Sequence, residues 1–303
     1  MIRTMKTQKL AFLTALLAMM AIGASAQDYV FKVLANKGTN EVKSGNSWEP
    51  LKVGTTLKAG DEVRVGSNAY VGLVHNSGKP LEVKAAAVYK VSDLESQVGT
   101  SASVLEKYTD FILSSNEGQG NRLTATGAVH RDVVLESAQI KVNLPEKDFS
   151  AIFSNTAVVR WDGGNVKGPY VVTVRNMFED ILVQAETNDN RYVINLDDEK
   201  FANEVAWLVE VSAKADAKIV SPTKLIKRLP PAENKRIAAE LKQLEDITEK
   251  SSAMSQYVLA NFFEKNNLVI DAIMAYEEAV KLEPEVPMFR EQYDAFLQRY
   301  RLQ

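Results

Sequence analysis

Cysteine is absent from this chain of 303 residues. Its absence excludes disulfides, thiolate zinc sites and thiol nucleophiles, so we expect burial alone to hold the fold together. A large excess of charge of one sign is also missing, because 36 basic and 39 acidic side chains leave a net charge of −3. Such a dispersed, mildly acidic balance lacks the basic footprint of nucleic-acid-binding proteins, and we expect no nucleic-acid partner.

Long apolar runs are scarce as well, and the clearest one spans residues 10–22. It follows the basic residues Arg3, Lys6 and Lys9 and precedes an Ala-x-Ala sequence that ends at Ala26. This order is that of a secretory signal peptide at residues 1–26, with cleavage expected after Ala26. The run is short for the ~30 Å hydrocarbon core of a bilayer, which disfavours the alternative of an uncleaved membrane anchor.

The rest of the chain has no other segment long and apolar enough to cross a bilayer, and it has no cysteine to carry a lipid anchor. We therefore expect an exported protein that is not integral to a membrane. The expected location is the periplasm of a Gram-negative bacterium, and the pattern leaves the cell surface and secretion open as alternatives.

Turn and strand signals alternate in the first part of the chain. Glycines recur every six residues over positions 54–78, and Gly60-Asp61 is a turn pair because glycine tolerates positive φ and Asp can bond its own backbone. Between such turns, residues 62–65 and 70–74 carry the alternating or clustered apolar side chains of short strands. The pattern predicts a small β domain.

The spacing W-x-x-L-x-x-G-x-x-L-x-x-G-D-x-V-x-V-G, from Trp48 to Gly66, resembles the FecR-like β domain of bacterial envelope proteins. The resemblance covers residues 28–90 and implies an envelope setting, with turn glycines and core apolar residues rather than catalytic groups. FecR itself relays a signal from an outer-membrane receptor to a membrane-bound anti-sigma system. The resemblance therefore also implies, as an alternative, a sensor or regulator role with an outer-membrane receptor as partner.

Residues 27–142 are expected to form this FecR-like domain, with a helical insertion near residues 92–115. Ser92 and Glu95 form a Ser-x-x-Glu capping box that predicts the start of a helix. The Gly- and Asn-rich residues 116–121 predict an exposed loop, and alternating apolar residues predict further strands over 122–142.

Residues 143–229 predict a second all-β domain. An apolar strand ends at Trp161, turns follow, and a β-branched strand begins at Tyr170. This pair resembles strands B and C of immunoglobulin or fibronectin type III modules, which implies a β-sandwich. The remaining strands are expected at residues 181–185, 192–196, 206–211 and 217–220.

Residues 230–303 predict a short all-α domain, which begins at Pro230-Pro231 because this pair ends a strand ladder and suits a helix start. Residues 257–284 are similar to one tetratricopeptide-like repeat, with small and large packing residues at Leu259, Ala260, Phe263, Ala272, Tyr276, Ala279 and Pro284. The next helix is expected at residues 289–300. Four helices form a short array, so we expect this domain to lean on the β-sandwich.

Catalytic patterns are missing, and we predict no enzyme activity, no metal site and no cofactor. A Ser-His-Asp triad would need Asp132 to orient His130, but residues two apart on a strand lack that geometry, and both His75 and His130 are interpreted as ordinary exposed strand positions. The acidic run at residues 197–199 lacks the alternate spacing of a calcium loop and predicts a turn. Trp161 and Trp207 are interpreted as core anchors; the alternative is a platform on which a glycan stacks, to which Trp48 would also belong.

A candidate partner-binding groove lies between the predicted helices at residues 254–265 and 271–281, closed by residues 289–300. A tetratricopeptide repeat binds peptides in such a groove, and the polar members are expected to point away from the core. The alternative is that a lone repeat is a structural cap or a dimer contact. The candidate residues are Gln256, Asn261 and Glu264 as hydrogen-bonding groups and Tyr257 and Phe263 as apolar anchors.

Three functions follow from these patterns. The leading one is a non-catalytic scaffold or adaptor that holds other envelope proteins. The second is the FecR-type sensor or regulator of an outer-membrane uptake or signalling system. The third is a binder of cell-wall glycan or peptidoglycan through exposed aromatic side chains.

Overall fold

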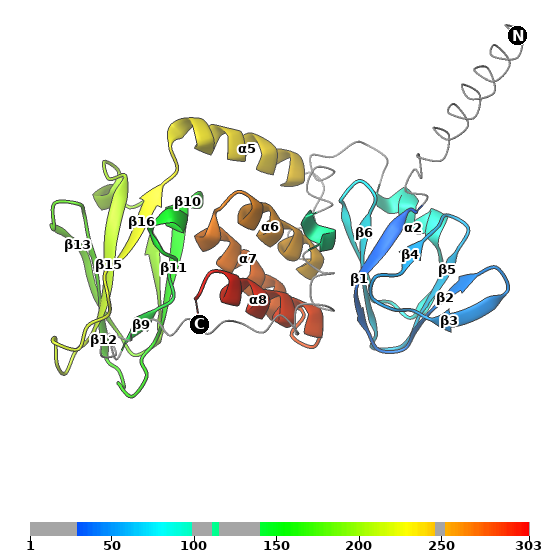
Figure 1. Ribbon diagram of the computed structural model, residues 1–303, viewed down its shortest axis with the longest axis horizontal. Helices are drawn as coiled ribbons and strands as arrows, with labels where there is room; N and C mark the ends of the chain where they lie inside the picture. The colour runs from blue at the N-terminus through cyan, green and yellow to red at the C-terminus, as the bar shows by residue number, and fades with distance from the viewer. Residues whose placement is uncertain (1–28, 99–110, 115–139, 246–251, 303) are drawn as a thin grey trace, which may run out of the picture.

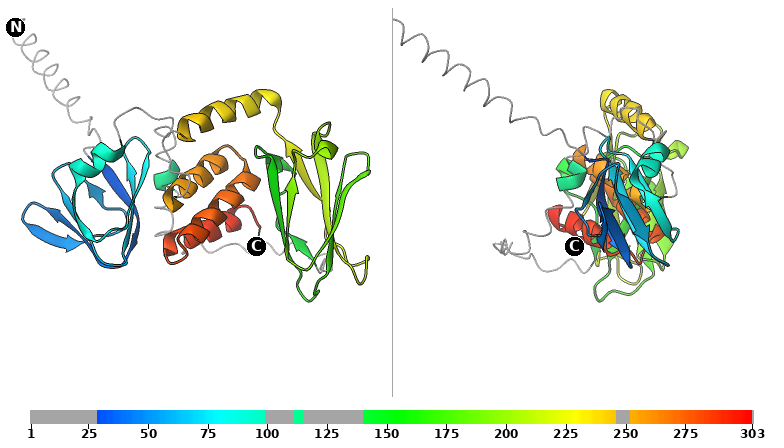
Figure 2. Two further views of the ribbon diagram at one scale, coloured as in Figure 1. Left: turned by 180° about the vertical axis from the view of Figure 1, so that it is seen from behind. Right: turned by 90° about the vertical axis from the view of Figure 1, so that its right-hand side faces the viewer.

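The computed structural model describes residues 29–98, 111–114, 140–245 and 252–302. The first two thirds of the chain are mainly β, and the carboxyl-terminal third is helical. The predicted signal peptide, His130, the loop at 116–121 and most of the predicted helical insertion lie outside the described residues. The helices occupy the middle of the molecule, between the two β regions (Figure 1; Figure 2, left).

The first β region is built from two four-stranded sheets with the orders β4-β1-β6-β7 and β3-β2-β5-β8. A helix, α2 (Val91–Val98), follows the last strand, where the capping box at Ser92 predicted one. The strands are β1 (Phe31–Lys37), β2 (Asn40–Ser44), β3 (Ser47–Pro50), β4 (Thr56–Leu57), β5 (Glu62–Val65), β6 (Tyr70–His75), β7 (Pro80–Val83) and β8 (Ala87–Lys90).

The turn before β5 shows why the Gly60-Asp61 pair stands there. The Asp61 carboxylate accepts hydrogen bonds from the backbone N–H of Lys58, at 2.8 Å, and from the Ser44 hydroxyl, at 2.8 Å. It thereby gives a hydrogen-bond acceptor to a backbone N–H of the turn and to a side-chain hydroxyl of β2. Asp61 is a structural turn residue.

The second β region is also made of two sheets, with the orders β10-β16-β15-β12-β13 and β14-β11-β9. The β10–β16 pair is parallel, and the others are antiparallel. The strands are β9 (Lys141–Val142), β10 (Ala151–Ile152), β11 (Thr156–Asp162), β12 (Tyr170–Arg175), β13 (Ile181–Thr187), β14 (Arg191–Asn195), β15 (Ala206–Ala213) and β16 (Lys224–Arg228).

Trp161 and Trp207 are both in the core of this region, as predicted. The Trp161 ring packs edge-on against Tyr170 at 5.4 Å, and the Trp207 ring packs against Phe201 at 5.7 Å. The strand predicted at residues 217–220 is wrong, because the chain there turns and makes a single bridge, from Val220 to Ser212.

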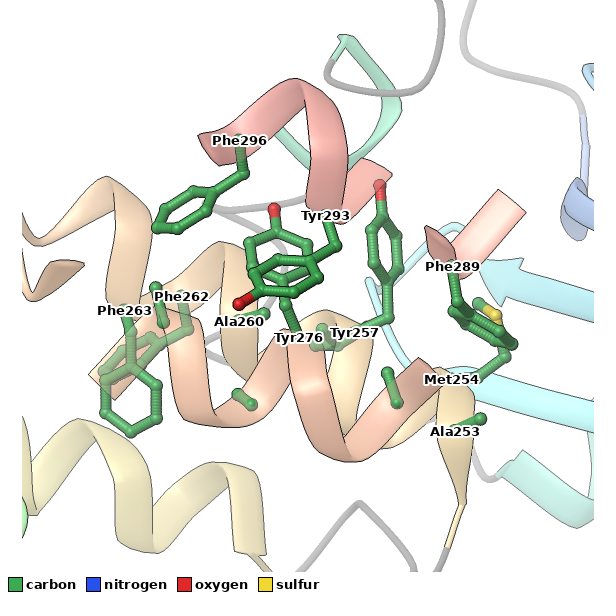
Figure 3. Close-up of a cluster of buried hydrophobic side chains, with 14 of the residues drawn as sticks. Ala253, Met254, Tyr257, Ala260, Phe262, Phe263, Tyr276, Phe289, Tyr293 and Phe296 are labelled. Carbon is green, nitrogen blue, oxygen red and sulfur yellow. The ribbon is translucent and has the colours of Figure 1, made fainter. Parts of the chain in front are cut away.

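The helical region contains α5 (Pro231–Glu245), α6 (Ala253–Lys265), α7 (Val269–Leu282) and α8 (Pro287–Arg299). Pro231 and Pro287 stand at helix starts, where a missing N–H costs nothing. The Ser252 hydroxyl caps α6 by accepting from the Ser255 N–H. Helices α6 and α7 form a hairpin, and the aromatic side chains of α8 pack against it (Figure 3).

Candidate functional site

The five residues predicted to line a peptide groove lie on α6, but four of them are buried inside the helical region. Tyr257 and Asn261 have no exposed surface, Glu264 is 5 % exposed, and Phe263 is also buried. Gln256 is partly buried and has interactions of its own. The expectation that Asn261 and Glu264 point away from the core is therefore wrong for this structure.

Glu264 is buried because two other helices supply its partners. The Arg299 guanidinium of α8 donates two hydrogen bonds to its carboxylate, each at 2.9 Å, and the Tyr276 hydroxyl of α7 donates a third at 2.9 Å. Burial and the adjacent Glu264 charge raise the pKa of Tyr276. The arrangement ties three helices together, since an unpaired carboxylate here would be costly.

Aromatic side chains fill the rest of the predicted groove (Figure 3). The Tyr257 ring packs against Tyr276 at 6.1 Å and against Phe289 of α8 at 6.2 Å. The Asn261 side chain donates to the Tyr257 carbonyl of its own helix at 2.8 Å. With α8 seated on α6 and α7, these residues serve the packing of the helical region.

The contact between the first β region and the helices centres on Glu82 of β7. Its Oε1 accepts from the Tyr70 hydroxyl at 2.7 Å and from the backbone N–H of Met254, in the first turn of α6, at 2.8 Å. Lys84 bridges Glu82, at 2.9 Å, to Glu283 after α7. Burial alone would raise the pKa of Glu82, but hydrogen bonds from Lys84, Met254 and Tyr70 lower it overall.

Close packing surrounds this carboxylate. Gly72 of β6 lies against Met254, and a Cβ at position 72 would come within 2.7 Å of the Met254 sulfur. Leu34 and Tyr70 of the β sheet share one buried cluster with the helices. The first β region and α6 therefore meet without a gap, through apolar contact around a capped helix start.

The second β region is attached through Asp271 in the first turn of α7. This buried carboxylate accepts from the backbone N–H groups of Phe153, at 2.9 Å, and Ser154, at 2.8 Å, in the connection between β10 and β11. Burial raises the pKa of Asp271, while these N–H groups oppose the rise. The two bonds satisfy backbone donors that no strand pairs.

Further contacts support the same seam. Arg160 of β11 forms an ion pair with Glu277 of α7, and Glu277 also accepts from the Tyr293 hydroxyl of α8 at 3.0 Å. The Phe149 ring packs edge-on against Tyr300 at 5.1 Å. The helical region is thus bonded to both β regions, and its polar residues act as structural connectors.

The histidine, tryptophan and acidic residues outside the helical region that could have formed a functional site have structural roles instead. The expectation that His75 is exposed is wrong, because this residue is buried, with Nδ1 2.7 Å from the Ser77 hydroxyl. Trp48 is half-buried under the Arg64 guanidinium, whose carbon lies 3.9 Å from the ring centre. The acidic run at 197–199 leads into a short 3-10 helix beginning at Glu199, so it is a turn as predicted. Within the described part of the chain, no group of three or more His, Asp or Glu is placed to hold a metal.

The most unusual surface lies at one end of the second β region and is called here the tip patch. It consists of Met177 and Phe178, in the turn after β12, and Val205, just before β15. Their exposed fractions are 53 %, 83 % and 72 %. The two segments are tied together, because the Asn176 side chain donates to Glu204 at 3.2 Å.

The tip patch was not predicted from the sequence. The one signal from which it could have been predicted is that two adjacent apolar residues, Met177 and Phe178, stand in the turn after a strand, where a polar pair is usual. Glu179, Asp180 and Glu204 stand beside the patch and give it an acidic rim. The tip patch and its rim form the candidate binding surface of the described residues.

The comparisons with known proteins assign no relative. No family model matches the chain, and no curated protein matches it. Among the helices that the structure describes, none is long and apolar enough to span a membrane.

Proposed function

We propose that this chain is a non-catalytic, exported envelope protein that acts as a scaffold or adaptor for other envelope proteins. The helices contact both β regions, and the tip patch belongs to the second β region, which lies on the other side of the helices from the first (Figure 1). Export follows from the signal-peptide pattern at residues 1–26. A rigid spacer that presents an apolar surface suits a partner-holding role better than catalysis.

The observation that carries the proposal is the exposure of Phe178. Soluble proteins seldom leave a large aromatic side chain in water beside other exposed apolar groups unless a partner covers it. Aromatic and Met side chains are enriched at protein interfaces, and a patch rimmed by Glu179 and Glu204 favours a partner with basic groups around an apolar pocket. The acidic rim also disfavours an anionic membrane surface as the target.

The identities of the three regions belong to the same proposal. We infer a FecR-like first region, supported by the burial of Leu51, Leu57, Val63 and Val65, which are apolar positions of the resembled pattern. An immunoglobulin- or fibronectin-like second region is supported by its two-sheet strand order. A tetratricopeptide-like α6–α7 hairpin is supported by the buried small residues Ala260, Ala272 and Ala279.

The other two functions have no observation in their favour among the described residues. Burial of Trp161 and Trp207 removes two of the three rings that a glycan platform would need, and Arg64 covers the third, Trp48. The FecR-type sensor role rests on the sequence resemblance alone. We keep the scaffold as the proposed function.

Site-specific photo-crosslinking tests this function. A photoreactive phenylalanine analogue replaces Phe178 in one chain and the equally apolar, 51 % exposed Val53 of the first β region in another. Irradiation in intact cells is expected to give a defined adduct with another envelope protein from position 178 and none from position 53. Equal adduct patterns at both positions, or no adduct at 178, would contradict the proposed binding surface.

A further inference from the structure

The edges of the four sheets differ in how they are protected from pairing with other chains. An open strand edge is a template for an added strand, and proteins blunt such edges with short strands, prolines or lysines. Most edges here follow that rule. The strands β4, β9 and β10 have two residues each, β3 and β7 contain proline, and β8 and β14 carry Lys90 and Arg191.

Strand β13 is the exception among the described strands. It spans seven residues, ILVQAET, pairs with β12 on one side, and contains neither proline nor a basic residue. Ile181, at its start, is 56 % exposed. The strand lies at the outer end of the molecule, where no helix covers it (Figures 1 and 2).

We propose that the free edge of β13 pairs with β13 of a second copy of this chain, antiparallel and about a twofold axis at Ala185. The two five-stranded sheets would then join into one continuous sheet across a homodimer. This inference does not rest on the proposed scaffold function, because it uses the backbone edge of residues 183–187 and none of the tip-patch side chains.

The register follows from two constraints. A twofold axis at one residue sets that residue opposite its own image and pairs the positions that lie equally far on either side of it. A bulge between β12 and β13 makes the strand irregular at Leu182. The regular part is residues 183–187. An axis at Ala185 is the choice that pairs this regular part entirely with itself, with Val183 opposite Thr187 and Gln184 opposite Glu186.

Charge complementarity favours the same axis. Glu186 is the single charged side chain on β13 and forms an ion pair with Lys214 at 2.6 Å; an axis at position 186 would set two such carboxylates against each other. An axis at position 184 would set Glu186 opposite the apolar Leu182. With the axis at Ala185, each Glu186 faces an amide of Gln184 that can donate to it.

A second copy suits this edge better than a strand of another protein. The regular run reads V-Q-A-E-T. When it pairs with its own reversed copy, Val183 lies opposite Thr187, and the Gln184 amide lies opposite the Glu186 carboxylate. An unguarded edge that is self-complementary is the minimal requirement for an isologous contact. A strand of a different protein is the competing outcome of the test below.

Two charge-changing substitutions at the exposed Gln184 test the pairing by sedimentation equilibrium of the full chain. Gln184→Glu sets a carboxylate opposite Glu186 at two symmetric positions, and we expect the dimer dissociation constant to rise about 2- to 30-fold. Gln184→Lys sets opposite charges there and is expected to lower the constant by a similar factor. If the axis lay at position 184, the substituted residue would face its own image, so both variants would instead raise the dimer dissociation constant.

Disulfide trapping gives a direct readout, because the chain has no cysteine of its own. Ala185→Cys brings two thiols together at the axis, and mild oxidation is expected to give a covalent dimer in high yield. Val193→Cys, on the edge of the other sheet, is the matched control for random collision and is expected to stay monomeric.

Three results would overturn the proposal. One is a monomer at all concentrations up to about 1 mM. Another is a dimer whose dissociation constant neither Gln184 variant changes. The third is a β13 edge that pairs with a different protein, recognised because Ala185→Cys is trapped with that protein and not with itself.

Discussion

Glu82 and Met254 stand 172 positions apart in the sequence, yet the Glu82 carboxylate accepts the backbone N–H of Met254 at 2.8 Å. A strand of the first β region thereby caps the start of α6. Carboxylates are favoured at helix starts because the free N–H groups there carry partial positive charge. This bond joins the first β region to the helical region.

Replacing Glu82 with Ala is expected to destabilise the protein by about 2 kcal/mol, because the change leaves the Tyr70 hydroxyl and the Met254 N–H without their acceptor. Urea denaturation measures the loss. Glu49→Ala, at an exposed position of β3, is the control and is expected to change stability by less than about 0.5 kcal/mol.

Acid is expected to weaken the same contact. The pKa of Glu82 is lowered below its usual 4.5, so its stabilising effect is complete above pH 4.5 and is lost as the pH falls through the folded-state value. The wild-type chain should therefore lose more stability between neutral pH and pH 3 than Glu82→Gln does. Equal losses would show that Glu82 carries no charge-dependent contact.

His75 predicts a second pH effect with a different window. Burial lowers the pKa of His75 below 6.5, with Lys79 acting in the same direction and Glu95 against it. Since the unfolded chain binds the proton first, this contribution is complete above pH 6.5 and declines as the pH falls toward the folded-state value. Proton NMR of a His130→Gln chain, in which His75 is the remaining imidazole, should give a titration midpoint below 6.5; a midpoint above 6.5 would contradict it.

Asp271→Ala is expected to cost about 2–5 kcal/mol, because two N–H groups, of Phe153 and Ser154, lose their buried acceptor. Thermal unfolding followed by circular dichroism measures this loss. Asp189→Ala, in the exposed turn between β13 and β14, removes a carboxylate without such partners and serves as the control. Similar losses in the two variants would refute the role of Asp271 as a connector.

Ala272→Leu tests the packing of the α6–α7 hairpin. Ala272 has no exposed surface, so a larger side chain overpacks the seam and is expected to cost about 1–3 kcal/mol. Ala238→Leu, at an exposed position of α5, is the matched control and is expected to be neutral. If the two substitutions were equally tolerated, the hairpin would not be packed as described.

Strand and helix positions could be predicted from the sequence where the pattern is local. The strands ending at Trp161 and beginning at Tyr170, and the helix start at Pro231, are set by neighbouring residues. The strand predicted at 217–220 fails because Asp216 accepts from the backbone N–H groups of Lys218 and Ile219 and closes a turn instead.

The site could not be predicted in the same way. On α6 alone, Asn261 and Glu264 look like solvent-facing polar residues, and the burial of Glu264 depends on Arg299 and Tyr276 from other helices. No pattern within one element reveals such partners. Likewise, the exposure of Phe178 depends on where its turn lies in the folded sheet. A sequence pattern does not show this, because apolar residues normally indicate a buried position.

The central claim is that the helices bond the two β regions into one rigid body, and the absence of cysteine allows it to be tested by double electron–electron resonance. Spin labels on Val88→Cys of β8 and Val193→Cys of β14, both exposed strand positions, report the separation of the two regions. With the labelled chain diluted in an excess of unlabelled chain, so that distances between copies do not contribute, we predict one narrow distance distribution that broadens when Glu82→Ala and Asp271→Ala are combined. A broad distribution in the chain without these two substitutions would contradict the account.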